Sequence, residues 1–287
     1  RMNFFTSDPF ALSAAVIIDL GMPDVAVQKV NQTFPALEGA FSQFDEVSIY
    51  TYSSNVSRVA DFGIAGKKLT AVLNQLKTAR GSNSGPPVTG GPFGPQGATI
   101  NGRPVDPSTP VVFTPPRQSR VLNDAILAAA MDLRKRDATR RKIIFVISDG
   151  RELGSNASYG DTLKVLLSNG ILVYGIGVEG AAIPLYGKLQ KLRLPRAGTG
   201  DILPKYASAT GGEIFPKFSR EAIESAYAQA IGEARYQYTL GYLARATPSS
   251  TFREIEVKVA RPDCEEFQPP CVRTFARDGY YPLPPGR

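Results

Sequence analysis

The sequence predicts an α/β fold in which a mostly parallel central sheet carries helices on both faces and is followed by a C-terminal antiparallel β extension. Two apolar runs, at 15–21 and 143–150, each contain one carboxylate and end at turn residues, as buried parallel strands do. Between residue 11 and about residue 235, strand-like runs alternate with amphipathic helices. Beyond residue 235 the pattern changes to the polar–apolar alternation of antiparallel strands.

The predicted strands of the main sheet are short apolar or alternating runs bounded by turn residues. Segment 47–52 alternates, and we expect segment 58–62 to pair beside it. The remaining strands are predicted at 12–18, 143–148, 171–178 and 213–215.

Helices are predicted between these strands. Segment 66–79 places Leu69, Leu73 and Leu76 on one face, as an amphipathic helix does. Ser219 is a typical N-cap, and Gly211 is typical of the residue that follows a helix. The predicted set is 24–44 with an interruption at Pro35, 66–79, 120–136, 159–168, 200–209 and 219–234.

We expect two units, an α/β unit over 1–235 and an antiparallel extension over 236–287. In the extension, 236–243 and 252–259 are predicted to form a hairpin, with 272–275 as a third strand.

A Gly/Pro-rich insertion interrupts the α/β unit at 81–117, with seven glycines and nine prolines. Such a composition does not build a core. The segment leads into the helix that begins near Arg120, so we expect it at the sheet end that carries Asp19 and Asp149. It is either a tolerated surface insertion or a lid or partner-binding loop.

The charge of the chain does not indicate a nucleic-acid partner. The formal net charge is +7 and the pI about 9.4, but the densest basic cluster, 134–142, lies where a predicted helix ends, and a helix C-terminus favours cations. The sequence shows no basic motif interleaved with aromatic residues of the kind that single-strand binders use.

No apolar run approaches the roughly 20 residues needed to span a bilayer, so we expect no membrane insertion. The chain begins at Arg1 without a signal-peptide pattern, which we interpret as a processed or excised piece of a longer protein.

The two cysteines, Cys264 and Cys271, are close in sequence. The chain has no histidine, and two thiolates alone are too few for a structural zinc site. We expect a disulfide, which the chain-entropy model values at roughly 2–3 kcal/mol, and hence an extracytoplasmic location, secreted or periplasmic. Two reduced cytosolic thiols are the alternative.

The candidate site consists of two acids at strand ends, Asp19 and Asp149. Ligand sites of open α/β sheets lie outside the carboxyl ends of the strands. The two carboxylates are therefore expected close together, as the remains of a cation site.

These residues stand in motifs that resemble a von Willebrand factor type A (VWA) domain, most closely the VWA-related proteins of bacterial secreted type. This family has a Rossmann-like fold. The matching motifs lie at 15–21, 121–125, 143–150, 173–178, 238–242 and 277–281.

The resemblance implies a metal-ion-dependent adhesion site. In such a site, an Asp-x-Ser-x-Ser turn, a threonine and a further aspartate hold a divalent cation, and an acidic group of the partner completes the coordination shell of that cation. Such hard cations prefer oxygen ligands. Asp19 and Asp149 match the two aspartates. The two serine positions fall on Gly21 and Pro23, which have no side-chain oxygen, and the threonine position falls on Arg120. The site is therefore expected to be degenerate.

Three interpretations of Arg120 remain open. Its guanidinium replaces the metal by pairing with Asp19 and Asp149, since a permanent cation cannot ligate a metal but can bind carboxylates. Alternatively, a weak Mg²⁺ or Mn²⁺ site persists on the two acids with Ser119 or loop oxygens. In the third interpretation Arg120 points elsewhere and the acids cap turns. Asp124 is expected to be an acid that supports the ligands or caps backbone groups, not a ligand itself.

The resemblance implies a non-enzymatic protein–protein interaction or adhesion module. Because its ligand positions are degenerate, we expect this chain to have lost metal-dependent ligand binding and to use no cofactor. The protein partner and the oligomeric state stay open. The chain has no histidine, no phosphate-binding loop and no Gly-x-Ser-x-Gly elbow, which argues against catalysis. The alternatives are an adhesion domain that retains a weak cation site, a structural domain of a larger secreted protein, and, least favoured, a hydrolase that uses Asp19 or Asp149.

Overall fold

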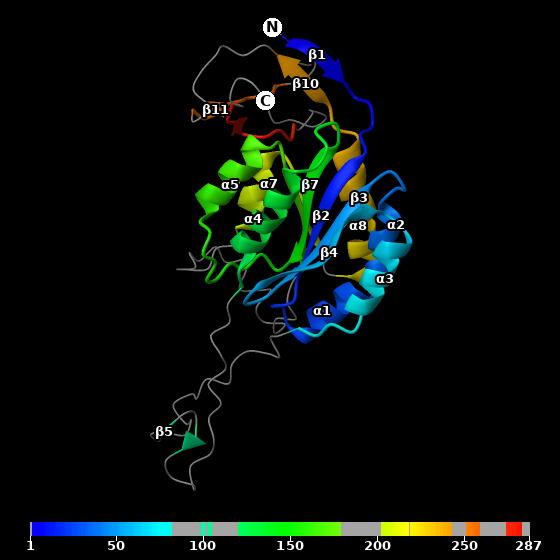
Figure 1. Cartoon of the computed structure of the whole chain (residues 1–287), viewed down its shortest axis with the longest axis vertical. Helices are drawn as coiled ribbons and strands as arrows, with labels where there is room; N and C mark the ends of the chain where they lie inside the picture. Colours follow the sequence, from blue (N-terminus) through cyan, green and yellow to red (C-terminus); the bar gives the residue numbers. More distant parts are fainter. Residues whose placement is uncertain are drawn as a thin grey trace.

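The structure is a computed structural model, and it describes residues 2–81, 99–100, 103–104, 120–178, 202–217, 219–242, 251–258 and 274–282. Its centre is a six-stranded sheet with the order β4-β3-β2-β7-β8-β9 (Figure 1). Neighbouring strands are parallel except β3 and β4, which are antiparallel. The strands are β2 (Leu12–Asp19), β3 (Glu46–Tyr52), β4 (Val56–Ile64), β7 (Arg141–Ser148), β8 (Leu172–Val178) and β9 (Ile214–Lys217). The predicted fold class is confirmed.

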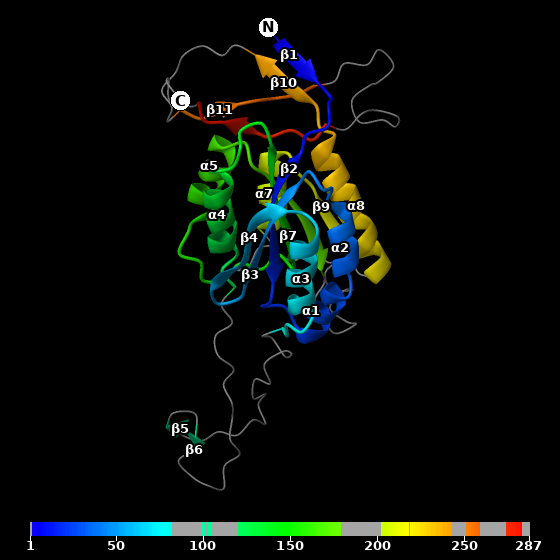
Figure 2. The ribbon, with the colours of Figure 1, turned by 45° about the vertical axis from the view of Figure 1, so that its right-hand side comes forward.

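Helices cover both faces of this sheet (Figures 1 and 2). They are α1 (Asp24–Asn31), α2 (Phe34–Ala40), α3 (Lys67–Leu76), α4 (Leu122–Leu133), α5 (Tyr159–Ser168), α7 (Leu203–Thr210) and α8 (Arg220–Arg235). The central strand β2 is buried along its whole length, and its alternate residues enter two separate cores. Val16 belongs to the core that contains side chains of α1, α2, α3 and α8, whereas Ile17 belongs to the core that contains side chains of α4, α5 and α7. An apolar run without alternation is what a strand between two helical layers requires.

The helix ends follow the predicted local signals. Ser219 accepts a hydrogen bond from the backbone of Ala222 at the start of α8, and Gly211 ends α7 in the left-handed conformation at φ 81°. Pro35 lies in the first turn of α2, so the predicted helix over 24–44 is divided into α1 and α2. Proline is tolerated in a first turn because its missing N–H has no partner there.

The predicted hairpin in the C-terminal extension is wrong. Strand β10 (Thr239–Tyr242) pairs antiparallel with β1 (Met2–Thr6), and β11 (Arg253–Glu254) pairs with β12 (Gly279–Tyr280). The physical reason is that the N-terminal segment runs beside the end of α8, where the Phe10 N–H bonds to the Arg235 carbonyl at 3.4 Å. This contact places β1 beside β10.

The N-terminal strand thus joins the extension, although the division at residue 235 placed it in the α/β unit. Figure 2 shows β1, β10 and β11 together at the end of the sheet away from α1. Of the predicted third strand, residues 274–275 are described and have no strand conformation. The division into units over 1–235 and 236–287 stays a prediction.

Two predictions fall largely or wholly outside the described residues, namely most of the insertion over 81–117 and the disulfide between Cys264 and Cys271. Within the insertion, a short antiparallel pair is described, β5 (Thr99–Ile100) with β6 (Arg103–Pro104). Among the described helices, none combines the length and the apolar character that crossing a bilayer requires.

Candidate functional site

The candidate site lies where three neighbouring parallel strands end. Asp19 ends β2, Tyr52 ends β3 and Ser148 ends β7, with Asp149 directly after it. The register pairs Asp19 with Tyr52, and Ile18 with the residue before Ser148. The sheet therefore brings the two predicted acids to one edge, as the sequence indicates.

The Asp19 carboxylate is completely buried and hydrogen-bonded on both oxygens. Its Oδ1 accepts from the Gly21 N–H at 2.7 Å. Its Oδ2 accepts from the hydroxyl of Tyr52 at 3.0 Å and from that of Ser148 at 2.8 Å. A buried charge is tolerated when donors surround it in this way.

The pKa of Asp19 is raised to about 6, because burial and the neighbouring Asp149 carboxylate disfavour its charged form. Arg120, the Ser148 hydroxyl and the Gly21 N–H act in the opposite direction without cancelling burial. Burial also raises the pKa of Tyr52 well above its ordinary value, so this hydroxyl is a hydrogen-bond donor and not a phenolate.

Arg120 projects into the space between the two acids. Its Nη1 lies 2.5 Å from each carboxylate oxygen of Asp149 and 4.0 Å from Oδ2 of Asp19. The side chain of Arg120 is 4% exposed and that of Asp149 is 8% exposed, so this ion pair is buried. Of the three interpretations of Arg120, the described contacts favour pairing with the acids.

The backbone holds Arg120 in this position just before α4. Its N–H donates to the Leu153 carbonyl at 2.7 Å, and the Leu153 N–H returns a bond to the Arg120 carbonyl at 2.9 Å. This antiparallel bridge joins the start of α4 to the loop that follows β7.

Gly21 leaves the space that Arg120 fills. A Cβ on Gly21 would lie 3.0 Å from Oδ1 of Asp19, 3.1 Å from Cγ of Arg120 and 3.3 Å from its Nε. A serine here would require these neighbours to move by a few tenths of an ångström. Pro23 precedes α1 and caps it without a side-chain hydrogen bond.

The described residues do not fit a divalent cation at this edge. Arg120 holds both oxygens of Asp149, three donors hold those of Asp19, and Gly21 and Pro23 offer no oxygen. Across the described ranges, no group of three or more His, Cys, Asp or Glu side chains is placed to hold a metal. Ser119, a ligand in the weak-site interpretation, lies outside the described residues.

Acids around the site hold the loop after β7 to α4. Glu152 accepts from the Asn123 N–H at 2.9 Å. Asp124 accepts from the N–H groups of Asn156 at 3.0 Å and Ala157 at 2.7 Å. Asp124 thus accepts backbone N–H groups, as a capping acid does.

Sequence reasoning missed Tyr52 and Ser148, the two hydroxyl donors to Asp19. A signal was present, since each residue ends a strand next to β2. Aligning the carboxyl ends of the predicted strands would have placed both hydroxyls beside Asp19.

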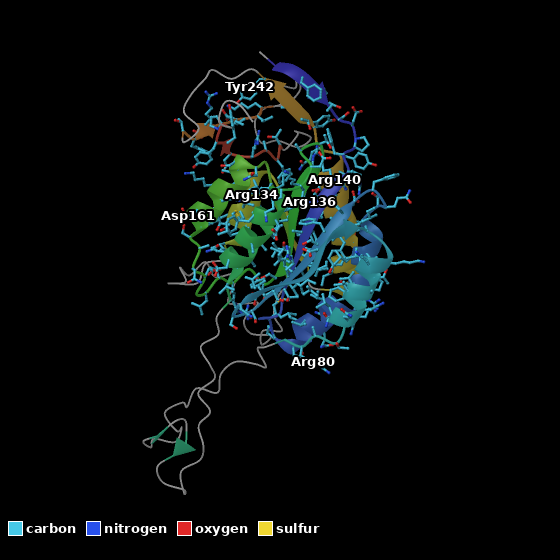
Figure 3. All side chains as sticks on the ribbon, in the orientation of Figure 1. Arg80, Arg134, Arg136, Arg140, Asp161 and Tyr242 are labelled. Carbon is cyan, nitrogen blue, oxygen red and sulfur yellow. The ribbon has the colours of Figure 1, made fainter. Side chains whose placement is uncertain are left out.

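The basic cluster over 134–142 binds other parts of the protein. Arg136 donates to both carboxylate oxygens of Glu46, at 2.8 and 2.5 Å. Arg140 donates to the Leu12 carbonyl at 2.8 Å. Figure 3 shows both arginines far from Arg80, which marks the site end. The contacts of these arginines are structural.

No protein-family model and no curated protein matches the sequence. Among solved structures, the chain is similar to the conserved hypothetical protein BatB from Bacteroides thetaiotaomicron, with 13% identity over 78% of this chain and 98% of that chain, at a TM-score of 0.50. It is also similar to a von Willebrand factor type A protein from Catenulispora acidiphila, with 9% identity over 79% of this chain and 43% of that chain, at a TM-score of 0.51. The chain therefore has the VWA fold that its motifs predict.

Proposed function

We propose that this chain is a non-enzymatic protein-interaction or adhesion module of VWA type, in which the guanidinium of Arg120 replaces the divalent cation. One observation carries the proposal: Nη1 of Arg120 lies 2.5 Å from both oxygens of Asp149 and 4.0 Å from Asp19. An interaction role follows from the VWA fold by analogy.

A metal would have to displace a buried and paired guanidinium. Breaking a buried ion pair by removing one partner costs about 3–5 kcal/mol. Arg120 also stays charged: burial alone would lower its pKa, but the carboxylates of Asp149 and Asp19 together outweigh burial and raise it. A divalent ion therefore competes poorly for this space.

The partner is expected to bind without an ion bridge. Arg120, Asp19 and Asp149 are buried, so an acidic side chain of a partner cannot reach them. Contact then depends on the insertion over 81–117 or on another face. An extracytoplasmic location belongs to the same proposal and rests on the predicted disulfide.

The geometry gives no support to the hydrolase alternative. Tyr52, Ser148 and Asp19 form a hydrogen-bonded group, but all three are buried beneath the Arg120–Asp149 pair. The chain has no histidine to act as a general base.

Calorimetry with Mg²⁺, Mn²⁺ and Ca²⁺ tests the replacement of the metal. We expect no binding to the natural chain and measurable Mg²⁺ or Mn²⁺ binding to the triple variant Gly21→Ser, Pro23→Ser, Arg120→Thr, which restores the missing oxygens. Adding Asp149→Asn to the triple variant should remove that binding. Micromolar binding to the natural chain would contradict the proposal and favour a retained cation site.

Affinity capture tests the interaction role. The immobilised chain should retain the same protein from the extracytoplasmic fraction of its source in EDTA and in Mg²⁺. Retention only in Mg²⁺ would favour metal-dependent adhesion, and the absence of any specifically retained protein would contradict the interaction module.

A further inference from the structure

Two tyrosines meet at the end of the molecule opposite the candidate site, where Figure 3 labels Tyr242. Tyr242 ends β10 and Tyr280 ends β12. The Tyr242 hydroxyl donates to the Tyr280 hydroxyl at 3.0 Å, and the ring centroids lie 6.4 Å apart with an interplanar angle of 81°. Tyr242 is 47% exposed and Tyr280 is partly exposed, so both can be reached from solvent.

Two arginines surround the Tyr280 ring. Arg253 donates from Nη1 to the Tyr280 hydroxyl at 3.1 Å, and its guanidinium carbon lies 5.9 Å from the ring centroid. The guanidinium carbon of Arg277 lies 5.5 Å from the same centroid. The hydrogen bond from Tyr242 and then the Arg253 contact lower the pKa of Tyr280.

We propose that Tyr242 and Tyr280 form an oxidative cross-linking site, at which a haem peroxidase with hydrogen peroxide joins the two rings. Each phenol loses one electron to the oxidant and its hydroxyl proton to solvent. The two phenoxyl radicals form a carbon–carbon bond between the ring carbons next to the hydroxyls, and the two ring hydrogens then move to the oxygens. In total the protein loses two hydrogen atoms, and one hydrogen peroxide becomes two waters.

The contact between the hydroxyls brings the reacting ring carbons close together, and exposure leaves the rings room to turn. The buried pair Tyr159 and Tyr206 has a shorter centroid distance of 4.6 Å, but Tyr206 is completely buried and donates to Asn123. Tyr238 is exposed, but the ring contact described for it is a stack on Phe5 and not on a second tyrosine.

A cross-link between Tyr242 and Tyr280 would join β10 to β12. These strands belong to two separate small sheets, β1–β10 and β11–β12. The bond would close the covalent loop over 243–279 and make the two sheets one unit. Its effect is therefore to stabilise the extension without altering the candidate site.

The experiment treats the complete chain at low micromolar concentration with horseradish-type peroxidase and hydrogen peroxide. We expect dityrosine fluorescence in the monomer, an intact mass lower by two hydrogens, and one cross-linked peptide pair that contains Tyr242 and Tyr280. The melting temperature of the cross-linked monomer should rise.

The variants Tyr242→Phe and Tyr280→Phe should each lower monomer dityrosine at least fivefold, whereas the matched control Tyr238→Phe should leave it unchanged. Dityrosine confined to covalent dimers, or a monomer cross-link between other tyrosines, would overturn the proposal. The peptide map of the natural chain decides this even where a variant fails to fold.

Discussion

At the scale of single residues, Gly21 and Arg120 depend on each other. The arginine side chain passes 3.1–3.3 Å from the place where a Cβ of Gly21 would lie, and its guanidinium binds Asp149. A substitution at either position therefore changes which residue types the other position tolerates. The sequence predicts both departures from the metal-binding pattern, but only the structure shows that one makes room for the other.

Replacing Arg120 by Thr leaves Asp149 buried without its cation. We expect a loss of about 3–5 kcal/mol in the free energy of unfolding at pH 7, measured by urea denaturation. Arg151→Thr is the matched control, because Arg151 lies 3.6 Å from the same carboxylate but is 57% exposed, and it should cost less than about 1 kcal/mol. Equal losses for the two variants would contradict a dominant role for Arg120.

Gly21→Ser should destabilise the natural chain and be tolerated in the Arg120→Thr background. The reason is that the added Cβ meets Asp19 and Arg120 at 3.0–3.3 Å, and removing the arginine opens that space. A double-mutant cycle on urea denaturation should give a coupling of about 1–2 kcal/mol. A coupling near zero would show that the two positions are independent.

Asp19 predicts a pH dependence with a definite sign. Because its pKa is raised to about 6, the folded state binds more protons than the unfolded state between about pH 4 and pH 6. The contribution of this group to stability is therefore lost as the pH rises through that window. We therefore compare the free energies of unfolding of Asp19→Asn and of the natural chain by urea denaturation. The difference between them should shift in favour of the variant by about 2–3 kcal/mol between pH 4.5 and pH 7.5.

Asp45 provides a control of opposite sign. Burial would raise its pKa, but hydrogen bonds from Arg235, Leu12 and Ser42 outweigh burial and lower it. Asp45 therefore stabilises the folded state at neutral pH and loses this contribution as the pH falls. Asp45→Asn should therefore have a lower free energy of unfolding than the natural chain at neutral pH, and this difference should become smaller at acidic pH. A pH-independent difference for Asp19→Asn would contradict its raised pKa.

At the scale of elements, the prediction succeeds where local pattern and burial agree. The middle parts of β2 and β7 are apolar without alternation because helices cover both faces, and their sequences show this directly. The pairing of β10 could not be predicted, because alternation indicates a strand but not its partner, and β1 lies more than 230 residues away. The same limit applies to the site. The positions of Asp19 and Asp149 follow from strand ends, whereas the direction of Arg120 depends on its bridge to Leu153.

The β1–β10 pair should be less stable than the main sheet, because an isolated two-stranded sheet is marginal in water. Phe5 stacks on Tyr238 at 5.4 Å, an interaction worth about 0.5–1.5 kcal/mol. Phe5→Ala should therefore speed hydrogen exchange of the β1 and β10 amides about 2- to 10-fold and leave the β2 amides unchanged. Val25→Ala, at another exposed apolar residue, should change neither. Equal effects on β2 and β10 would show that both sheets unfold together.

At the scale of the whole molecule, the site end and the extension lie at opposite ends of the main sheet (Figures 1 and 2). Both described ends of the Gly/Pro-rich insertion meet the turn after β2. The Gly81 N–H donates to Oδ1 of Asp24 at 3.0 Å, and a Cβ on Gly81 would collide with the Met22 carbonyl. Arg120, at the other end, rests on Gly21.

This arrangement predicts that the insertion can be shortened without unfolding the domain. Because its ends are fastened to the same turn, a short Gly/Ser linker in place of residues 83–118 should close the chain, and loop-closure entropy changes by only about 0.6 kcal/mol per doubling of length. We expect the melting temperature to stay within about 3 °C of the natural value, since 1 kcal/mol corresponds to a few degrees in a domain of this size. If partner capture is lost while the melting temperature is kept, the insertion carries the interface. If capture is retained, another face does. A large fall in the melting temperature would instead show that the insertion packs as part of the fold, which its composition argues against.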